Sequence, residues 1–492
     1  MARSTIDFGI DLGTTNSAVA VVNGLTSNVK VFRNPDGLEY TPSVVHEDRA
    51  GSLRVGLYAK GKLEQDPENT KSEFKTDIGS SGASVERVFT RSGRRMTPVQ
   101  LSAEVLKALR ADVERDSGEV VEAAVITVPA AFELPSCAAT QRAAEAAGFK
   151  QTALLQEPTA AALAYLEHFE GTQGYWLVFD FGGGTFDAAV VRLQDGSFIC
   201  AAHAGDNDLG GKLIDWAIVY ELFIPALTKQ YRLTDFRRGN KTWGGAMAKL
   251  KDQAEKAKIQ TTTHEAVEFK IDYLCEDDAK QKVEFEFTLR RTDVDRLCET
   301  YIRRAIEKCR QALREAKLQA NDVISVLLVG GPTLMPCFRQ ALADPKTGLG
   351  IPLDFSQDPL TVVARGAAKY ARRQQKIEAK GGGGQPVDPA VAQLEIHLKP
   401  VGPEIDPIVT GQLAVAGTTD FSGFTIEFTN STMRPPWRSG RVGLSPEGKF
   451  YTNLEVSVQE PGQFTTQPLF VNGNSDDYFY VQGKIGLATA LA

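Results

Sequence analysis

Two short segments of the chain combine an aspartate with a turn rich in glycine and threonine. Residues 11–17 read DLGTTNS and residues 180–187 read DFGGGTFD, so the two aspartates are 169 positions apart (180 minus 11), and each segment lies between apolar stretches. Glycines permit positive φ and bring bare backbone N–H groups close to an anion. Each segment therefore predicts a β-hairpin whose turn can hold phosphate, and two such hairpins can grip a polyphosphate from both sides.

The aspartates that precede these turns add a second kind of chemistry. Asp11 and Asp180 each end an apolar strand pattern, where an unpaired charge is costly. Mg²⁺ prefers one or two carboxylates together with several waters, so this pair can hold the hydrated ion that neutralises a polyphosphate. Neither segment is a Walker A motif, because no GxxxxGK[ST] is present, and neither is a Rossmann fingerprint, because a strand pattern follows the glycines.

Together with four further segments, these hairpins resemble the seventy-kilodalton heat-shock chaperone family of the DnaK type, within the wider group of actin and sugar-kinase folds. The further segments are VITVPA (125–130), EPTAAA (157–162), GDNDLGG (205–211) and VGGPT (329–333). The likeness covers about residues 5–372, and the EPTAAA segment separates chaperone-like members from actins and sugar kinases. It implies an α/β fold, with a two-lobed actin-like ATPase domain of duplicated RNase-H-like cores followed by a C-terminal β-sandwich.

The resemblance implies ATP or ADP as the ligand, with Mg²⁺ and K⁺ as candidate cations, and hydrolysis of ATP to ADP and phosphate. It places Asp11, Asp180 and Glu157 around the metal. Water is the attacking group in this reaction, so a carboxylate must orient it; Asp180 is the first candidate and Asp187 the second.

Further residues would contact the phosphates and the nucleoside. Lys75 is the best match for the lysine that the family places near the γ-phosphate, although Lys71 lies close by. Thr185 offers a backbone N–H and a hydroxyl as donors to phosphate oxygens. The remaining contacts implied for the nucleotide are Gly13, Thr14, Thr15, Asn16, Gly182, Gly183, Gly184, Thr185, Gly210, Gly211, Glu255, Lys258, Ile259, Gly330, Gly331, Pro332 and Leu334.

Two of these positions depart from the family, which stacks adenine between two arginines where this chain has Ile259 and Leu334. An apolar pair can still bury a purine but loses a cation–π contribution of up to about 2 kcal/mol. We therefore expect nucleotide affinity below that of typical members. Pro129 matches a proline that the family uses as a switch between lobe arrangements, with Arg142 as the nearest match for its relay; the alternative is a proline that fixes a turn at a strand end.

Composition bounds these interpretations. The chain has 492 residues, 42% of them hydrophobic, and 62 acidic against 55 basic side chains give a net charge of −7. These values exclude a disordered, collagen-like or coiled-coil chain and give no prior for nucleic acid. No stretch approaches about 18 uninterrupted apolar residues, and no signal peptide precedes the first strand, so no membrane is expected. Six scattered cysteines without CxxC argue against a zinc site or a disulfide scaffold and fit a reducing cytoplasm, and the five histidines show no metal spacing.

Local patterns predict several elements of the second lobe. Residues 265–274 and 282–289 alternate between apolar and polar side chains and predict a hairpin, with an acidic turn between them. Residues 300–318 carry one apolar stripe and predict a helix, which leads into a buried strand over 323–329. Residues 249–258 predict an amphipathic helix that carries Glu255 and Lys258.

The predicted organisation is an ATPase domain over residues 1–375, with lobe I over about 1–172 and lobe II over about 173–375, followed by two further parts. A glycine-rich linker, flexible by composition, covers 376–391, and alternating strand patterns over 392–492 predict a β-sandwich. The family's short docking linker is replaced by glycines, and no helical lid is expected after the sandwich, as in a truncated piece or a lidless relative.

The function expected from this resemblance is that of an ATP-dependent chaperone. Its partners would be unfolded or extended polypeptides, bound by the β-sandwich, together with J-domain and nucleotide-exchange co-chaperones. Coupling between the two domains is expected to be weak, because glycines offer no side chain for docking. Two alternatives stay open: a nucleotide-gated scaffold for one dedicated partner, and a small-molecule kinase of the same fold group.

Overall fold

The structure is a computed structural model of the chain. It describes residues 5–372 apart from 24–27, 64, 81–84, 133, 166–172 and 195–196, and after residue 392 it describes separate short segments between 393 and 484. Among the described residues, no helix is both long enough and apolar enough to cross a membrane.

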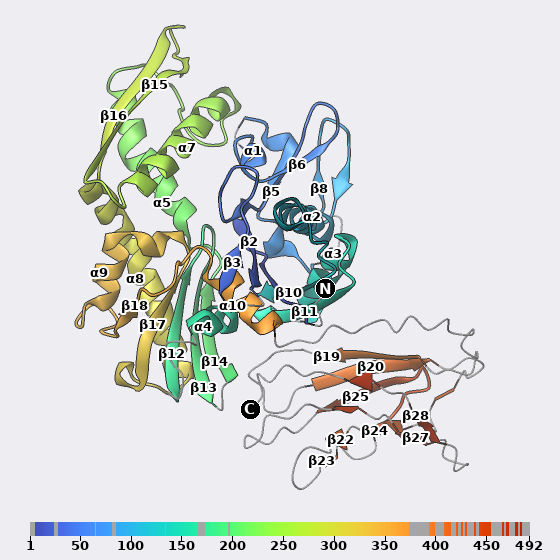
Figure 1. Cartoon of the computed structure of the whole chain (residues 1–492). Coiled ribbons are helices and arrows are strands. Elements are labelled where there is room, and N and C mark those ends of the chain that lie inside the picture. Colours follow the sequence, from blue (N-terminus) through green and yellow to red (C-terminus); the bar gives the residue numbers. More distant parts are fainter. Residues whose placement is uncertain are drawn as a thin grey trace.

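Two mixed sheets with the same connectivity form the centres of two lobes (Figure 1). In the first, β1 and β2 are an antiparallel hairpin, and β10 and β11 add to β1 in parallel. In the second, β12 and β13 are the hairpin, and β17 and β18 add to β12 in parallel. The first sheet comprises β1 (Phe8–Asp11), β2 (Asn16–Val22), β3 (Val29–Val31), β4 (Thr41–Pro42), β10 (Ala123–Val128) and β11 (Gln151–Gln156). The second comprises β12 (Gly174–Phe181), β13 (Phe186–Gln194), β14 (Ser197–Asp206), β17 (Val323–Val329) and β18 (Leu353–Asp354). This repetition is the duplicated core that the sequence predicts.

Helices cover both sheets, and their ends follow from local sequence. In α2 the side chain of Thr97 accepts a hydrogen bond from the backbone N–H of Gln100 while Gln100 caps Thr97 in return, and Gly118 ends the helix in the left-handed region at φ 70°. The helices are α1 (Leu57–Lys60), α2 (Pro98–Ser117), α3 (Leu134–Ala146), α4 (Glu157–Tyr165), α5 (Gly211–Ile218), α6 (Ile224–Thr228), α7 (Gly244–Gln260), α8 (Arg291–Glu315), α9 (Pro336–Ala343) and α10 (Val362–Ala371).

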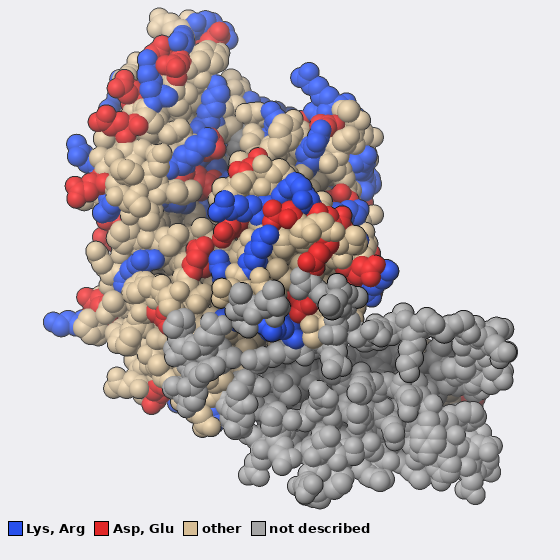
Figure 2. Space-filling view, in the orientation of Figure 1, with Lys and Arg blue, Asp and Glu red and all other residues tan. Residues whose placement is uncertain are grey.

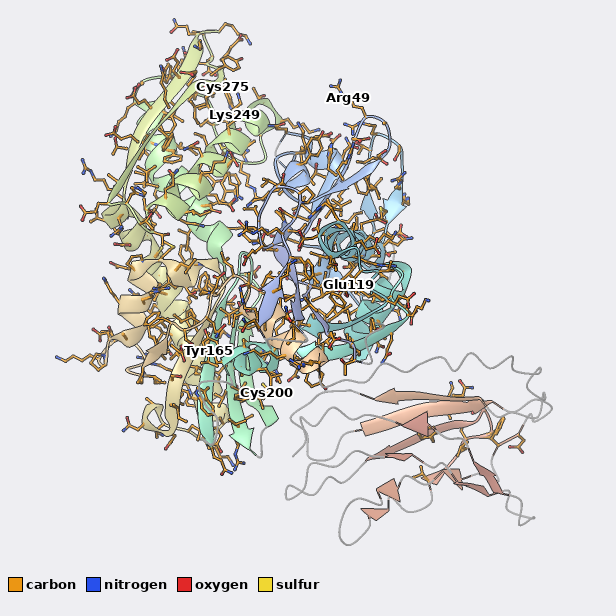
Figure 3. The ribbon with its side chains drawn as sticks, in the orientation of Figure 1. Arg49, Glu119, Tyr165, Cys200, Lys249 and Cys275 are labelled. Carbon is orange, nitrogen blue, oxygen red and sulfur yellow. The ribbon has the colours of Figure 1, made fainter. Side chains whose placement is uncertain are left out.

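Helices α4 and α10 lie between the two sheets. Their apolar side chains share one core with residues from β10, β12, β13 and β17, and the hydroxyl of Tyr165 donates to the carbonyl of Leu328 at 3.4 Å (Figure 3). Gly366 lies against the backbone of Ala160 so closely that a side chain there would clash. Although the sequence assigns residues up to 375 to lobe II, α10 contacts β1, β2, β10 and α4, which are elements of lobe I.

Each lobe carries a smaller outer part. Lobe I has a three-stranded sheet of β5 (Val44–Glu47), β6 (Leu53–Val55) and β7 (Thr70–Ser72), next to α1 and the hairpin β8 (Arg87–Val88) and β9 (Arg95–Met96). Lobe II has α7 and the long hairpin of β15 (Ala266–Glu276) and β16 (Lys282–Arg290), where Figure 3 places Lys249 and Cys275. This hairpin confirms the predicted one. On the visible face of both lobes, acidic and basic side chains are interspersed among other residues (Figure 2).

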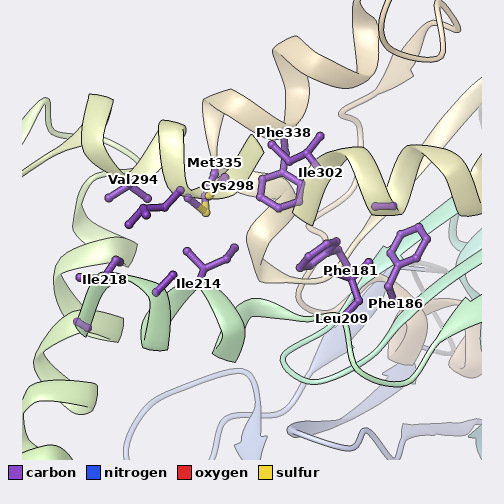
Figure 4. Close-up of a cluster of buried hydrophobic side chains, with 14 of the residues drawn as sticks. Phe181, Phe186, Leu209, Ile214, Ile218, Val294, Cys298, Ile302, Met335 and Phe338 are labelled. Carbon is purple, nitrogen blue, oxygen red and sulfur yellow. The ribbon is translucent and has the colours of Figure 1, made fainter. Parts of the chain in front are cut away.

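The core of lobe II lies directly under its glycine-rich turn. Phe181 and Phe186 flank that turn and pack with Phe338 and with residues of α5 and α8 (Figure 4). The structure confirms the strand predicted over 323–329, but α8 begins at Arg291 rather than at residue 300. Val294, Leu297 and Cys298 continue the buried stripe through that extra length, although the polar residues between them mask it in the sequence.

The described segments after residue 392 contain strands, turns and a few irregular residues. A three-stranded antiparallel sheet joins β19 (Gln393–Leu398), β20 (Ile408–Ala414) and β25 (Lys449–Asn453). Short pairs are β21 (Thr425–Ile426) with β24 (Val442–Gly443), β22 (Thr429–Asn430) with β23 (Trp437–Arg438), β26 (Thr465–Thr466) with β29 (Gly483–Lys484), and β27 (Leu469–Val471) with β28 (Tyr478–Tyr480). The predicted linker over 376–391 and the predicted strand over 454–458 lie outside the described residues, and the β-sandwich stays a prediction.

Candidate active site

The turns of the two central hairpins meet at the interface between the lobes. In lobe I, the hydroxyl of Ser43 donates to the carbonyl of Gly13 at 2.7 Å and holds the β1–β2 turn. In lobe II, the N–H of Gly182 donates to the carbonyl of Thr185 at 2.9 Å. A Cβ on Gly183 would lie 2.5 Å from Oγ1 of Thr15, so only glycine lets the turns approach this closely.

Between these turns is a cavity of about 330 Å³, which we call the front cavity. Among the residues predicted to act on phosphate or metal, Asp11, Gly13, Thr14, Thr15, Asn16, Lys75, Glu157, Asp180, Gly182, Gly183, Thr185, Asp187, Gly330 and Gly331 line it. Pro129 lines it as well, whereas Arg142, proposed as its relay, is exposed on α3. Gly184 and Gly210 line neither this cavity nor its neighbour, because they lie against each other.

The front cavity contains more negative than positive charge. Lys75 is only 3% exposed and its Nζ lies 2.6 Å from Oε1 of Glu157. Burial, and then the charge of Glu157, raise the pKa of both Asp11 and Asp187 to about 7, although Lys75 opposes this. The same causes, with Asp187 and Asp11 as further neighbours, raise the pKa of Asp180. A cation in this cavity would therefore be strongly favoured.

Mg²⁺ with a polyphosphate fits the groups that this cavity presents. Its walls offer carboxylate oxygens, which Mg²⁺ prefers. Within the described part of the chain, no three His, Cys, Asp or Glu side chains stand close enough to hold a metal alone, so waters and phosphate oxygens would complete its shell. Oγ1 of Thr15 and Oδ1 of Asn16 are buried without a hydrogen-bond partner among the described residues, and a phosphate or sugar would supply one.

A second cavity of about 220 Å³, the side cavity, shares Thr14, Thr15, Asn16, Gly183, Gly331 and Leu360 with the front cavity. The other residues predicted to contact the nucleotide, Gly211, Glu255, Lys258, Ile259, Pro332 and Leu334, line it. A ligand with its phosphates in the front cavity can therefore extend its remaining part into the side cavity. Ile259 is 59% exposed and stands at its wall as an aliphatic group.

The side cavity also contains three charged residues that the sequence patterns did not indicate, Asp215, Lys60 and Lys251, and they pair with the predicted Lys258 and Glu255. Nζ of Lys258 lies 2.6 Å from Oδ1 of the buried Asp215, and Oε1 of Glu255 lies 2.6 Å from Nζ of Lys60. Burial would raise the pKa of Glu255, but the ammonium groups of Lys251, Lys60 and Lys258 outweigh it and bring the pKa to about 2. The spacing of Lys251 and Glu255, four residues apart on one helix, is a signal that could have revealed their pair.

Two ion pairs join the lobes across the cavities. Lys60 of lobe I pairs with Glu255 of lobe II beside the side cavity, and Lys212 of lobe II pairs with Glu73 of lobe I near the phosphate turns. Glu73 adopts a positive φ of 58°, two residues before Lys75. No sequence pattern predicts either pair, because their members come from different lobes.

Two lobes of one topology, with paired glycine-threonine turns and a carboxylate-lined cavity at their interface, define an actin-like ATPase fold. Comparison with known proteins identifies the family. A protein-family sequence model described as "Hsp70 protein" matches residues 7–373, and the chain belongs to the Hsp70 family. "Chaperone protein DnaK" of Mycoplasmopsis synoviae (strain 53) is 37% identical over 369 residues, which make up 75% of this chain and 58% of that protein. The resemblance seen in the sequence is thus confirmed, and this chain spans 58% of the length of that relative.

The raised pKa of Asp187 predicts a pH-dependent stability. Folding raises the pKa of this carboxyl from its ordinary value near 3.8 to about 7, so the folded state resists its ionisation. The folded protein therefore loses stability as the pH rises above 3.8, and the loss is complete above about pH 7. Asp187→Asn is therefore expected to raise the melting temperature of the nucleotide-free protein at pH 8 by about a few degrees, with little change at pH 4. Thermal unfolding at both pH values measures this.

Asp206→Asn is the matched control for this measurement. Although burial opposes the shift, Arg304, whose Nη2 lies 2.7 Å from Oδ2, lowers the pKa of Asp206, so this substitution should lower the melting temperature at pH 8. A lower melting temperature for Asp187→Asn at pH 8 would contradict the prediction.

Proposed function

We propose that this protein binds ATP with Mg²⁺ at the interface of its lobes and slowly hydrolyses it to ADP and phosphate. One observation carries the proposal: two glycine-threonine turns approach each other closely at a cavity that is lined by four carboxylates and one lysine. Phosphoryl transfer depends on positioned charge more than on covalent chemistry, and this cavity supplies such charge. Membership of the Hsp70 family supports the same reading.

Each charged residue of the front cavity has a proposed task. Asp11, Asp180 and Glu157 hold the hydrated metal, which when bound neutralises the phosphates. Asp180, with Asp187 as the second candidate, orients the attacking water and accepts its proton. Lys75 places a fixed positive charge where negative charge develops on the transferred phosphate, and Thr185 donates from the turn. K⁺ is a further candidate cation.

We further propose that the chain acts as a chaperone, with residues 392–492 binding extended or unfolded polypeptide. Support comes from the strand pairs after residue 392 and from the similarity to "Chaperone protein DnaK". J-domain and nucleotide-exchange co-chaperones are proposed partners. The glycines at 381–384 lie outside the described residues, and we propose weak coupling across them.

A nucleotide-dependent peptide-binding assay tests this function. An unfolded model polypeptide should bind the full chain with different affinity in ATP and in ADP, and its addition should change hydrolysis by less than about tenfold. Capture of one stoichiometric protein instead of many unfolded clients would favour a dedicated scaffold. Phosphate that appears on a sugar rather than in solution would favour a kinase.

The aliphatic wall of the side cavity predicts an unusual gain of affinity. Leu334→Arg is expected to tighten ATP binding by up to about 30-fold, because a guanidinium that stacks on a purine contributes about 0.5–2 kcal/mol. Titration calorimetry with ATP measures the effect. Leu63→Arg, on the same cavity wall but on lobe I, is the comparison variant, and equal tightening in both variants would show a general charge effect instead of stacking.

A further inference from the structure

A third and much smaller cavity lies behind the carboxylates of the front cavity, and we call it the rear cavity. It measures about 10 Å³, close to the space that the centre of one bound water needs. Its wall is formed by Ala130, Glu157, Pro158, Val178, Asp180, Asp187, Ala189 and His203. The rear cavity therefore has room for one water and polar groups around it.

Strand register places its polar side chains on one face of the second sheet. Asp180 of β12 is opposite Asp187 of β13, and Ala189 of β13 is opposite His203 of β14. Because side chains alternate along a strand, Asp187 and Ala189 point to the same face, and their partners Asp180 and His203 point there too. The other face carries the apolar core with Phe186, Ala188 and Ala204.

Two polar side chains of this row, those of Asp187 and His203, have no hydrogen-bond partner among the described residues. Within the described part of the chain, no hydrogen bond reaches the carboxylate of Asp187 or the imidazole of His203. Gly205, opposite Asp187, leaves room for this carboxylate, since a Cβ there would lie 2.7 Å from Oδ1. Buried carboxylates are normally hydrogen-bonded, and a buried water typically joins two to four polar groups.

We propose that the rear cavity holds one ordered water that accepts a hydrogen bond from the N–H of His203 and donates one to the carboxylate of Asp187. The remaining hydrogen of the water can reach Glu157 or Asp180, which share the wall. His203 is thereby a positioning residue: it orients the water, and the water fixes the carboxylate that faces the front cavity. This inference rests on the proposed hydrolysis of ATP.

Two different substitutions should remove this water. His203→Phe removes the N–H donor and Ala189→Val fills the rear cavity while leaving His203 in place. Both are expected to slow single-turnover hydrolysis by about tenfold, as for the loss of one positioning hydrogen bond, with the Kd for ATP unchanged. His203→Gln retains an N–H donor and should restore the rate to within about twofold. A role in folding alone would not produce this rescue at constant Kd.

His264→Phe, at an exposed position after α7, is the matched control and should hydrolyse ATP as the unsubstituted chain does. A normal hydrolysis rate in His203→Phe, or slow hydrolysis in His203→Phe together with a normal rate in Ala189→Val, overturns the proposal.

A high-resolution crystal structure of the full chain gives an independent test, because density for one water between His203 and Asp187 is expected with or without hydrolysis. Absence of this water from the rear cavity overturns the inference. If the water is present but the protein does not hydrolyse ATP, only the proposed function is overturned. If His203→Phe does not fold, the hydrolysis rate of Ala189→Val and the density for the water test the proposal.

Discussion

Asp11→Asn and Asp180→Asn are each expected to lower single-turnover hydrolysis of Mg²⁺-bound ATP by about a hundred- to a thousandfold. Asp11 is the last residue of β1, Asp180 is the next-to-last residue of β12, and both line the front cavity. Each substitution therefore removes one charge from the proposed cage for metal and phosphates. One preorganised electrostatic contact in such a cage contributes about 3–4 kcal/mol to the transition state. Quenched-flow measurement of released phosphate, with enzyme in excess over ATP, gives the rate.

Both variants should still fold, so a slower rate of hydrolysis can be attributed to the active site and not to a loss of stability. Burial and neighbouring carboxylates raise the pKa of Asp11 and of Asp180, so that a neutral asparagine removes repulsion from the nucleotide-free protein. Melting temperatures at pH 8 should therefore stay equal or rise. Asp206→Asn is again the control for the loss of one aspartate charge. Asp206 ends β14, lines neither the front nor the side cavity and pairs with Arg304, so this substitution should lower the melting temperature at pH 8. Near-normal hydrolysis in either cavity variant would remove that residue from the proposed cage.

Features encoded within one short stretch could be predicted from the sequence. The two hairpins with their turns, the hairpin of β15 and β16, and the strand β17 all follow from apolar alternation and glycine placement. The family likewise follows from local motifs. The same signals predict residues that line the front cavity, because a turn and the strands that flank it are contiguous in the chain.

Features that depend on contacts between distant segments could not be predicted. Lys75 and Glu157 are 82 positions apart, and only the folded chain shows that they form a part-buried pair. The pairs of Lys60 with Glu255 and of Lys212 with Glu73 join different lobes. His203 is an unremarkable lone histidine in the sequence, and only strand register sets it on the same face as Asp187. Side-chain type carries no information about such partners.

The position of Lys75 predicts the second large effect, a loss of hydrolysis in Lys75→Met. Methionine keeps the length of the side chain and removes its charge. Because Lys75 lines the front cavity and is 3% exposed, this charge acts in a poorly solvated site, where its loss should lower single-turnover hydrolysis by about a hundredfold or more. Lys107→Met, which breaks an exposed pair with Glu104 on α2, should leave hydrolysis unchanged.

A structural role for Lys75 has to be separated from a role in catalysis. Lys75→Met leaves Glu157, whose side chain is 15% exposed, without its ion-pair partner, which destabilises the fold by up to about 3–5 kcal/mol, the range for a buried pair. The double variant Lys75→Met, Glu157→Gln removes both charges and should recover most of the melting temperature. Hydrolysis by this double variant is compared with that of Glu157→Gln alone, because Glu157 itself belongs to the proposed metal cage. We expect the double variant to hydrolyse ATP at least about tenfold more slowly than Glu157→Gln alone. A lysine that acts on the phosphates contributes to the rate whether or not Glu157 is charged, so its loss slows both backgrounds. Equal rates for the double variant and Glu157→Gln would show that Lys75 serves only to neutralise Glu157.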